Sequence, residues 1–253
     1  MKYVKEMNRR TAAIINLVVL AFTIYWNYYS NTGNINGQSV GSLSNEYANF
    51  FTPASYAFSI WGIIYLSLIG NAIHLFLNKD KRDVLTQSKW LSLANIGNCF
   101  WIYAWLMEYT GLSVLTMILI LFVLTKNIIE LKIGIEKKPL WTWWPSSIYF
   151  GWIVVAMAAN LSAYLAKLNW QVLFSEDIWA AVLIVIALVI YLFLSRLRNI
   201  TYAAYVGVWA LVAIMAKQWD NNAIVQYTAL GSAAILFVST VIKDFQLRRK
   251  GIY

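Results

Sequence analysis

Chemically reactive side chains are scarce in this chain of 253 residues, which has one histidine, His74, and one cysteine, Cys99. Zinc sites and di-histidine haem sites draw several such ligands from one chain. A single cysteine also excludes an intrachain disulfide. The composition therefore argues against a metal centre and against disulfide chemistry, and we expect no metal-binding residues.

Acidic residues are also few, and all eleven lie in expected loops, at the ends of apolar segments or in the N-terminal tail. Ion-coupled transporters generally place an ionisable group deep in the membrane. The sequence shows no glycine-rich phosphate loop, no G-x-S-x-G nucleophile motif and no internal repeat of the kind that builds many transporters. These absences argue against ion-coupled transport and against hydrolase or nucleotide chemistry.

Apolar residues, in contrast, make up 60% of the chain, and charged residues only 12%. Soluble proteins carry about twice that share of charge. Apolar runs of about 20 residues recur, and a helix of that length crosses a hydrocarbon core of roughly 30 Å. We therefore predict an all-α polytopic membrane protein with about eight transmembrane helices. The predicted spans are 11–29, 54–78, 91–108, 111–132, 144–166, 178–195, 200–217 and 222–242.

The basic residues indicate how these spans are oriented. If all eight cross the membrane, eighteen of the twenty lysines and arginines fall on one side, and the exceptions are Lys167 and Lys217. Basic residues collect in cytoplasmic loops, so we predict a plasma (inner) membrane protein with both termini in the cytoplasm. The net charge of +9 then indicates contact with anionic membrane lipids rather than with nucleic acid.

The longest predicted connection joins the first two spans on the outer side. It is rich in Gly, Ser and Asn and has no lysine or arginine. Its second half contains Tyr47, Phe50 and Phe51, whose rings are expected to pack on another surface. Loops of this length are often functional, so we predict that these three residues belong to a lid.

Thirteen tryptophans stand in the chain, and most lie at the ends of predicted spans, where indole rings commonly anchor in the headgroup region. Others lie deeper, together with asparagines, where each N–H group needs a partner. Helical spacing places these deeper residues on one stripe in each of three spans. The stripes are Phe58, Trp61 and Tyr65 in the second span; Asn98, Trp101 and Trp105 in the third; and Trp152, Ala156, Asn160 and Tyr164 in the fifth.

Two interpretations of the stripes remain open. The rings and amides can hold helices together by hydrogen bonds, or they can line a pocket for a flat aromatic or sterol-like ligand below the lid. Aromatic pairs contribute about 0.5–1.5 kcal/mol beyond the burial of their area, and the small residues in AMAAN (156–160) allow close approach. A membrane enzyme acting on a lipid or porphyrin and a facilitative transporter of a small neutral solute are the alternatives.

The stripes resemble the TspO/MBR family, the tryptophan-rich sensory proteins that include the translocator protein or peripheral-type benzodiazepine receptor. In that family the second helix opens with prolines and aromatic residues, the third shows Asn-x-x-Trp, and the fifth shows a Trp followed eight residues later by Asn. The matching residues here are Pro53, Tyr56, Phe58, Trp61 and Tyr65; Asn98 and Trp101; and Trp152 and Asn160. The resemblance covers residues 11–170, and 171–253 lies outside it.

The resemblance implies a TspO-like five-helix membrane domain over residues 1–170, followed by a three-helix transmembrane extension over 171–253. It links the chain to porphyrin transport, sensing or light-dependent degradation. Because no acid, base or metal cluster lies deep in the predicted spans, we favour a sensor or carrier over an enzyme, with no catalytic residues and no required cofactor. Its ligands would be tetrapyrroles such as protoporphyrin or haem, sterol-like molecules or other flat hydrophobic compounds, and a homodimer is a further expectation. The expected ligand-binding residues are Tyr56, Phe58, Trp61, Tyr65, Asn98, Trp101, Trp152, Ala156 and Asn160.

Overall fold

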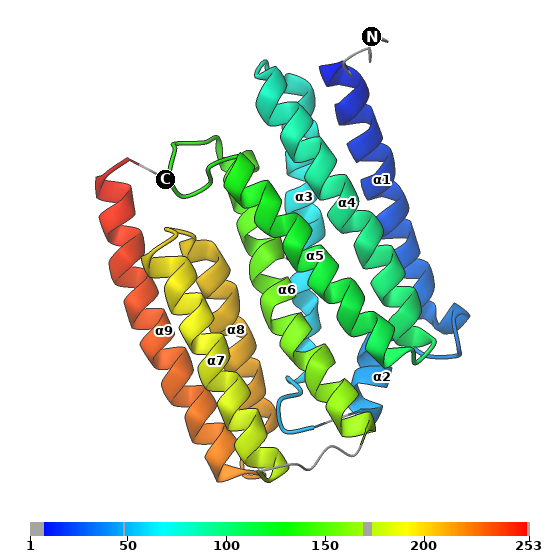
Figure 1. Cartoon of the computed structure of the whole chain (residues 1–253), viewed down its shortest axis with the longest axis vertical. Helices are drawn as coiled ribbons and strands as arrows, with labels where there is room; N and C mark the ends of the chain where they lie inside the picture. Colours follow the sequence, from blue (N-terminus) through cyan, green and yellow to red (C-terminus); the bar gives the residue numbers. More distant parts are fainter. Residues whose placement is uncertain (1–7, 48, 169–173, 252–253) are drawn as a thin grey trace, which may run out of the picture.

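The computed structural model describes residues 8–47, 49–168 and 174–251. Within these ranges the chain is helical, with no β-strand, and the long helices run side by side (Figure 1). The helices are α1 (Arg9–Tyr29), α2 (Val40–Glu46), α3 (Ile60–Leu77), α4 (Lys81–Leu106), α5 (Thr110–Glu130), α6 (Leu140–Lys167), α7 (Glu176–Arg196), α8 (Thr201–Lys217) and α9 (Ala223–Arg249), with a π-helical turn η1 (Ser30–Asn34) and a 3₁₀ turn η2 (Ser55–Ser59).

Each of the eight predicted spans coincides with one long helix. In the described parts of the chain, six helical segments are long and apolar enough to cross a membrane: α1 with η1, η2 with α3, and each of α5, α6, α7 and α9. Helix α8 is apolar but has only 17 residues, and α4 has 26 residues with a polar first part. The prediction of an all-α polytopic membrane protein is confirmed.

Two helix starts differ from the prediction for local reasons. Helix α4 begins ten residues before the predicted span, because the Asp80 side chain caps it by accepting a hydrogen bond of 3.0 Å from the Asp83 amide. Residues 55–59, predicted to open the second span, form the 3₁₀ turn η2 instead of α-helix. The 3₁₀ turn has three residues per turn, yet Phe58 near its end stays on the side of Trp61, since both rings contact Trp152 of α6.

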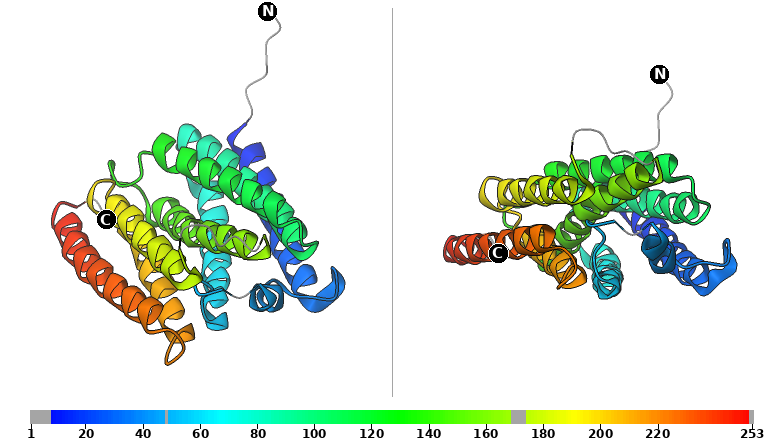
Figure 2. Two further views of the ribbon diagram at one scale, coloured as in Figure 1. Left: turned by 60° about the horizontal axis from the view of Figure 1, so that its bottom comes forward. Right: turned by 90° about the horizontal axis from the view of Figure 1, so that it is seen from below.

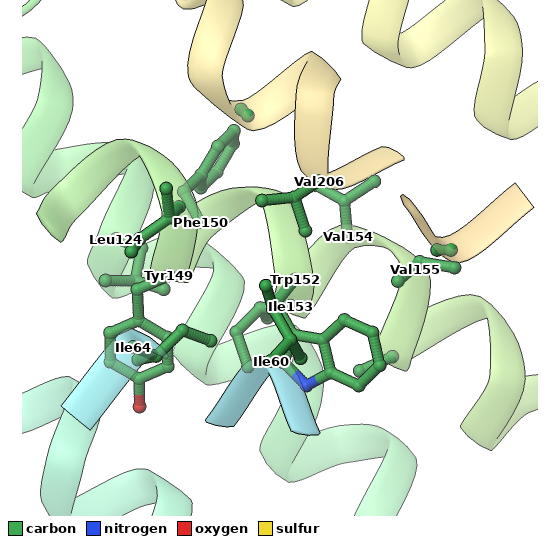
Figure 3. Packing of buried hydrophobic residues seen from close by; sticks show 14 of the residues in the cluster. Ile60, Ile64, Leu124, Tyr149, Phe150, Trp152, Ile153, Val154, Val155 and Val206 are labelled. Carbon is green, nitrogen blue, oxygen red and sulfur yellow. The ribbon is translucent and has the colours of Figure 1, made fainter. Parts of the chain in front are cut away.

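Helix α6 lies at the centre of the molecule and packs against α3, α5, α7 and α8. Figures 1 and 2 show α1, α4 and α5 on one side of it and α7, α8 and α9 on the other. In Figure 3, Val154 and Val155 of α6 point toward α8, whose Val206 lies beside them, and Ile60 and Ile64 of α3 cover another face of α6. A continuous apolar core therefore joins the first five long helices to the last three.

Two glycines permit close helix contacts, one between α6 and α8 and one between α8 and α7. A Cβ atom at Gly151 of α6 would lie 2.7 Å from the carbonyl oxygen of Ala203 in α8, and one at Gly207 of α8 would lie 2.6 Å from the Tyr191 ring of α7. The Tyr191 hydroxyl donates to the Gly151 carbonyl oxygen at 2.7 Å. Helix α8 thus meets α6 through backbone atoms, and the Tyr191 hydroxyl ties α7 to the same part of α6.

The connection between α1 and α3 has regular structure of its own. It contains η1 and the two-turn helix α2, which starts at a capping box formed by Ser39 and Ser42. Helix α2 lies at the end of the bundle opposite the start of α1 (Figure 1). It lies over the C-terminal ends of α4 and α6, next to the aromatic residues of the predicted stripes.

Candidate functional site

A hollow lies beneath α2, between that helix and the ends of α3, α4 and α6. It extends over about 540 Å³ up to its open side, but the space that the centre of a water molecule can reach is only about 40 Å³. One water needs roughly 10–15 Å³ by that measure, so the hollow is a narrow slot. Its walls are Val40, Ser44, Tyr47, Thr52, Pro53, Phe58, Trp61, Trp101, Trp105, Trp152, Val155, Ala156, Ala159, Asn160 and Ala163.

Trp61 is at the centre of the aromatic wall. Its ring stacks on that of Trp101, with centroids 6.4 Å apart and planes 24° apart, and meets Trp152 nearly at a right angle, at 6.5 Å and 81°. Phe58 contacts Trp152 edge-on at 6.1 Å. Stacked and edge-to-face geometries are the favoured ones for aromatic pairs. Three helices that are distant in sequence thus supply one contiguous set of flat apolar faces.

The indole N–H of Trp152 has no hydrogen-bond partner among the described residues, although the side chain is only 3% exposed. An unpaired buried donor costs about 1–3 kcal/mol. Two other indoles of the wall are satisfied: Trp101 donates to the Asn160 side-chain oxygen at 3.0 Å, and Trp105 donates to the Val40 carbonyl oxygen at 3.3 Å. Among these three indoles, Trp152 alone carries a free donor that a ligand acceptor could meet.

The carboxamide of Asn160 makes three hydrogen bonds within the protein, one fewer than it can form. Its oxygen accepts from Trp101 and, at 2.8 Å, from the Ser113 hydroxyl, while its nitrogen donates to the Ala156 carbonyl oxygen at 3.0 Å. Asn160 therefore joins α4, α5 and α6. The Asn160 carboxamide fits the first interpretation of the stripes, hydrogen bonding between helices. The Trp152 N–H forms no such bond among the described residues.

The structure brings together seven of the residues predicted for the pocket and its lid. They are Phe58, Trp61, Trp101, Trp152, Ala156, Asn160 and Tyr47. Tyr65 and Asn98 lie behind this wall, where the Asn98 amide donates to the Tyr65 hydroxyl at 3.1 Å and the Tyr65 ring stacks on Trp61. They support the wall without lining the hollow.

Three predicted residues lie elsewhere. Tyr56 is 44% exposed and packs edge-on against Trp209 of α8, because residues two apart in a helical turn point to different sides. Phe51 is fully buried in the core, and Phe50 lines a separate polar groove at the outer surface of the loop. Of the three predicted lid rings, only Tyr47 lines the hollow.

Residues from α2 and from the Thr52–Pro53 turn also line the hollow, and the stripes did not indicate them. Trp105 belongs to the predicted stripe of the third span but not to the expected ligand-binding set, and it lines the hollow. Val40 and Ser44 carry no such signal, because helix α2 is short and its position depends on contacts with distant helices. Among the described residues, no three His, Cys, Asp or Glu side chains gather in a way that could hold a metal ion.

A polar cluster holds the end of α2 over the hollow. The Tyr47 hydroxyl donates to the carboxylate of Glu108 in the α4–α5 turn. The Lys167 ammonium donates to the Glu108 carbonyl oxygen at 2.8 Å and lies 5.3 Å from the centre of the Tyr47 ring. The hydrogen bond to Glu108 raises the pKa of Tyr47 to about 12. We call Tyr47, Glu108 and Lys167 the latch.

Helix α8 holds the other side of the same loop. The amide of Ala54 donates to the Ala213 carbonyl oxygen at 3.0 Å, and the Trp209 indole donates to the Ala57 carbonyl oxygen at 3.2 Å. The Gln218 side chain donates to the carbonyl oxygen of Phe50, also at 3.2 Å. The loop above the hollow is thus fixed between the latch and α8.

Comparison with known proteins gives one match. A family model described as TSPO-like protein matches residues 13–242. No curated protein and no solved structure matches the chain significantly. The matched region includes α7, α8 and most of α9, so the similarity extends beyond the first five predicted spans. The division of the chain into two domains at residue 170 stays a prediction.

Proposed function

Because the chain belongs to the family of TSPO-like proteins, we propose that it is a membrane protein that binds a flat hydrophobic small molecule in the hollow beneath α2. The observation that carries this proposal is the unpaired N–H of Trp152 in a wall of aromatic rings. A flat ligand would lie against Trp61 and Trp152, and its carbonyl or ring-nitrogen acceptor would receive the hydrogen bond. Tetrapyrroles such as protoporphyrin or haem, and sterol-like molecules, are the ligand classes proposed.

The size of the hollow sets how such a ligand would bind. Pockets for ligands of this size commonly measure about 300–1,000 Å³, and the slot has this extent only when its open side is included. A tetrapyrrole would therefore require α2 and the Thr52–Pro53 turn to move outward. The latch is the contact that would open. Ligand binding would thus be coupled to a movement of α2 at the outer end of the bundle, and a sensor or a carrier requires such a conformational change.

The proposed location is the plasma (inner) membrane, with both chain termini in the cytoplasm and the hollow near the outer surface. The helix ends that carry the basic segments lie at the end of the bundle from which α1 starts, opposite α2 (Figure 1). This arrangement supports the proposed orientation because basic residues collect on the cytoplasmic side.

Titration of the purified protein with protoporphyrin tests the proposal. We expect saturable quenching of tryptophan fluorescence and a shift of the porphyrin absorption band. In the double variant Trp61→Phe with Trp152→Phe, the affinity should fall at least about tenfold, because a stacking face and a hydrogen-bond donor are both lost.

Trp219→Phe is the matched control, because this indole is 59% exposed and does not line the hollow. The control should bind protoporphyrin as the unaltered protein does. An unchanged affinity in the double variant would exclude this hollow as the porphyrin site. A protein that shows no saturable binding of protoporphyrin or of a sterol would contradict the proposed function itself.

A further inference from the structure

The ends of α7 and α9 carry an excess of positive charge at the end of the bundle opposite the hollow. Six basic residues and one acidic residue, Asp244, lie in the segments 196–198 and 243–250. We call Arg196, Lys243 and Lys250 the basic patch. These three residues come from two helices that pack against each other.

Contacts between α7 and α9 bring the three charges together. The Arg196 guanidinium donates to the Ser239 hydroxyl at 2.7 Å, which holds it against α9 one turn before Lys243. Lys250 follows Lys243 by seven residues, so both lie on one face of α9. The positive charges of Arg196 and Lys250 repel that of Lys243.

No acidic group lies within ion-pair distance of the basic patch in the described ranges 8–47, 49–168 and 174–251. Asp244, the nearest in sequence, pairs with Arg248 at 3.0 Å and accepts from the Thr201 hydroxyl at 3.3 Å. Cations at helix C-termini are favourable near the negative end of the helix dipole. That effect explains one cation at each helix end and does not offset the repulsion among three.

Two basic residues between α5 and α6, at the same end of the bundle, have counter-charges within the protein. Lys138 pairs with Asp83 at 2.9 Å, and Lys132 pairs with Glu136 at 2.6 Å. The basic patch gathers three cations from two helices without such a counter-charge, so its counter-charge has to come from outside the chain.

The surface next to the patch is apolar. Phe193 and Val189 precede Arg196 by three and seven residues, so they lie on the same face of α7, and they are 51% and 59% exposed. A molecule that binds both the basic patch and the apolar face of α7 needs an anionic headgroup and hydrocarbon chains. An arginine fork and two lysines provide the geometry and charge that favour a phosphate group.

We propose that Arg196, Lys243 and Lys250 bind the headgroup phosphate of an anionic phospholipid whose acyl chains lie along the exposed face of α7. This site is separate from the hollow beneath α2 and does not depend on the function proposed for it. It gives the last three helices a binding role of their own.

Native mass spectrometry of the full-length, delipidated protein tests the proposal with phosphatidylglycerol and phosphatidylcholine as probes. We expect the protein to retain phosphatidylglycerol preferentially. The variant Arg196→Gln with Lys243→Gln should lose affinity for phosphatidylglycerol, by about fivefold for each cation removed. An excess of inorganic phosphate should not displace the lipid, because it lacks the acyl chains.

The matched control is Lys79→Gln with Lys137→Gln, which removes two exposed positive charges at the same end of the bundle. Equal losses in the two double variants would overturn the proposal, because they would show attraction to net charge alone. Displacement by inorganic phosphate would also overturn it, in favour of a phosphate-ion site. Lys243→Arg, which keeps the charge, should retain binding, and circular dichroism of each variant checks that the helices remain folded.

Discussion

Trp152 and Asn160 lie two turns apart on one face of α6, and their polar atoms differ in whether they form hydrogen bonds within the protein. In a membrane, a polar group must find a partner inside the protein. Asn160 accepts two hydrogen bonds and donates one, so its carboxamide contributes to helix association. The Trp152 N–H is unpaired among the described residues. At the scale of single residues, the recognition role that we propose belongs to the indole, and helix association belongs to the amide.

Tyr47 is the residue at which access to the hollow can be tested. Replacing it in Tyr47→Phe keeps the ring but removes the hydroxyl that donates to Glu108. We expect protoporphyrin to associate and dissociate several-fold faster in this variant, because the latch loses a charge-assisted hydrogen bond. Stopped-flow fluorescence measures both rates. Tyr28→Phe, at a ring that is 70% exposed, is the control and should leave both rates unchanged.

The latch also has a defined pH dependence. The pKa of Tyr47 is raised to about 12 by its bond to Glu108, whereas a free tyrosine has a pKa of about 10. Because the pKa is raised, the hydrogen bond between Tyr47 and Glu108 stabilises the folded protein fully below about pH 10. This stabilisation is lost as the pH rises through about 12. The rates of protoporphyrin association and dissociation should therefore not change between neutral pH and pH ~9. A change in the unaltered protein that is absent in Tyr47→Phe would contradict the raised pKa of Tyr47.

At the scale of helices, the contact between α6 and α8 determines how the last three helices meet the others. The contact requires a glycine at 151, because a Cβ atom there would overlap the backbone of Ala203. Backbone atoms cannot move aside as a flexible side chain can. The same helix α8 holds the loop above the hollow through Trp209 and Gln218. A change in the α6–α8 contact should therefore reach the ligand site.

Gly151→Ala tests this contact. We expect it to destabilise the protein by about 1–3 kcal/mol, the usual cost of overpacking, and to lower the midpoint of thermal unfolding in detergent. Gly231→Ala in α9 is the matched control, since a Cβ atom there meets nothing within 4 Å. Because alanine favours helix over glycine by about 1 kcal/mol, the control should be as stable as the unaltered protein or more stable. Equal stability of the two variants would show that the α6–α8 contact is not close.

At the scale of the whole molecule, charge and hydrophobicity together arrange the chain across the membrane. Large apolar side chains face outward on most of the long helices; examples are Leu66, Phe100 and Leu119, which are more than half exposed. Exposed apolar surface of this extent requires a hydrocarbon surrounding. The basic patch and the hollow then lie at opposite ends of the molecule, where they would contact different leaflets.

Cysteine labelling tests the orientation. In a Cys99→Ala background, single cysteines replace Lys79 and Lys137 at one end, and Thr32 and Glu176 at the other; all four residues are exposed. We expect a membrane-impermeant maleimide to label the Thr32→Cys and Glu176→Cys variants in intact cells. The other two should react only after permeabilisation. The reverse pattern would invert the proposed topology, and a mixed pattern would show that one of the eight helices does not cross.

The sequence by itself determined the membrane class, the eight long helices, the common end of the basic segments and the family resemblance. These features depend on composition and on local periodicity, which a single chain displays directly. The family match confirms the resemblance, and the helices confirm the fold class.

Only the tertiary structure decided which rings line the hollow. Tyr56 packs on Trp209 of α8 and Phe58 lines the hollow, and the short helix α2 brings Val40 over Trp105. The partners of Asn160 come from α4 and α5. Each of these outcomes depends on how helices distant in sequence are rotated and packed against one another. A periodic pattern within one helix cannot specify that rotation, because it depends on the shape of the partner.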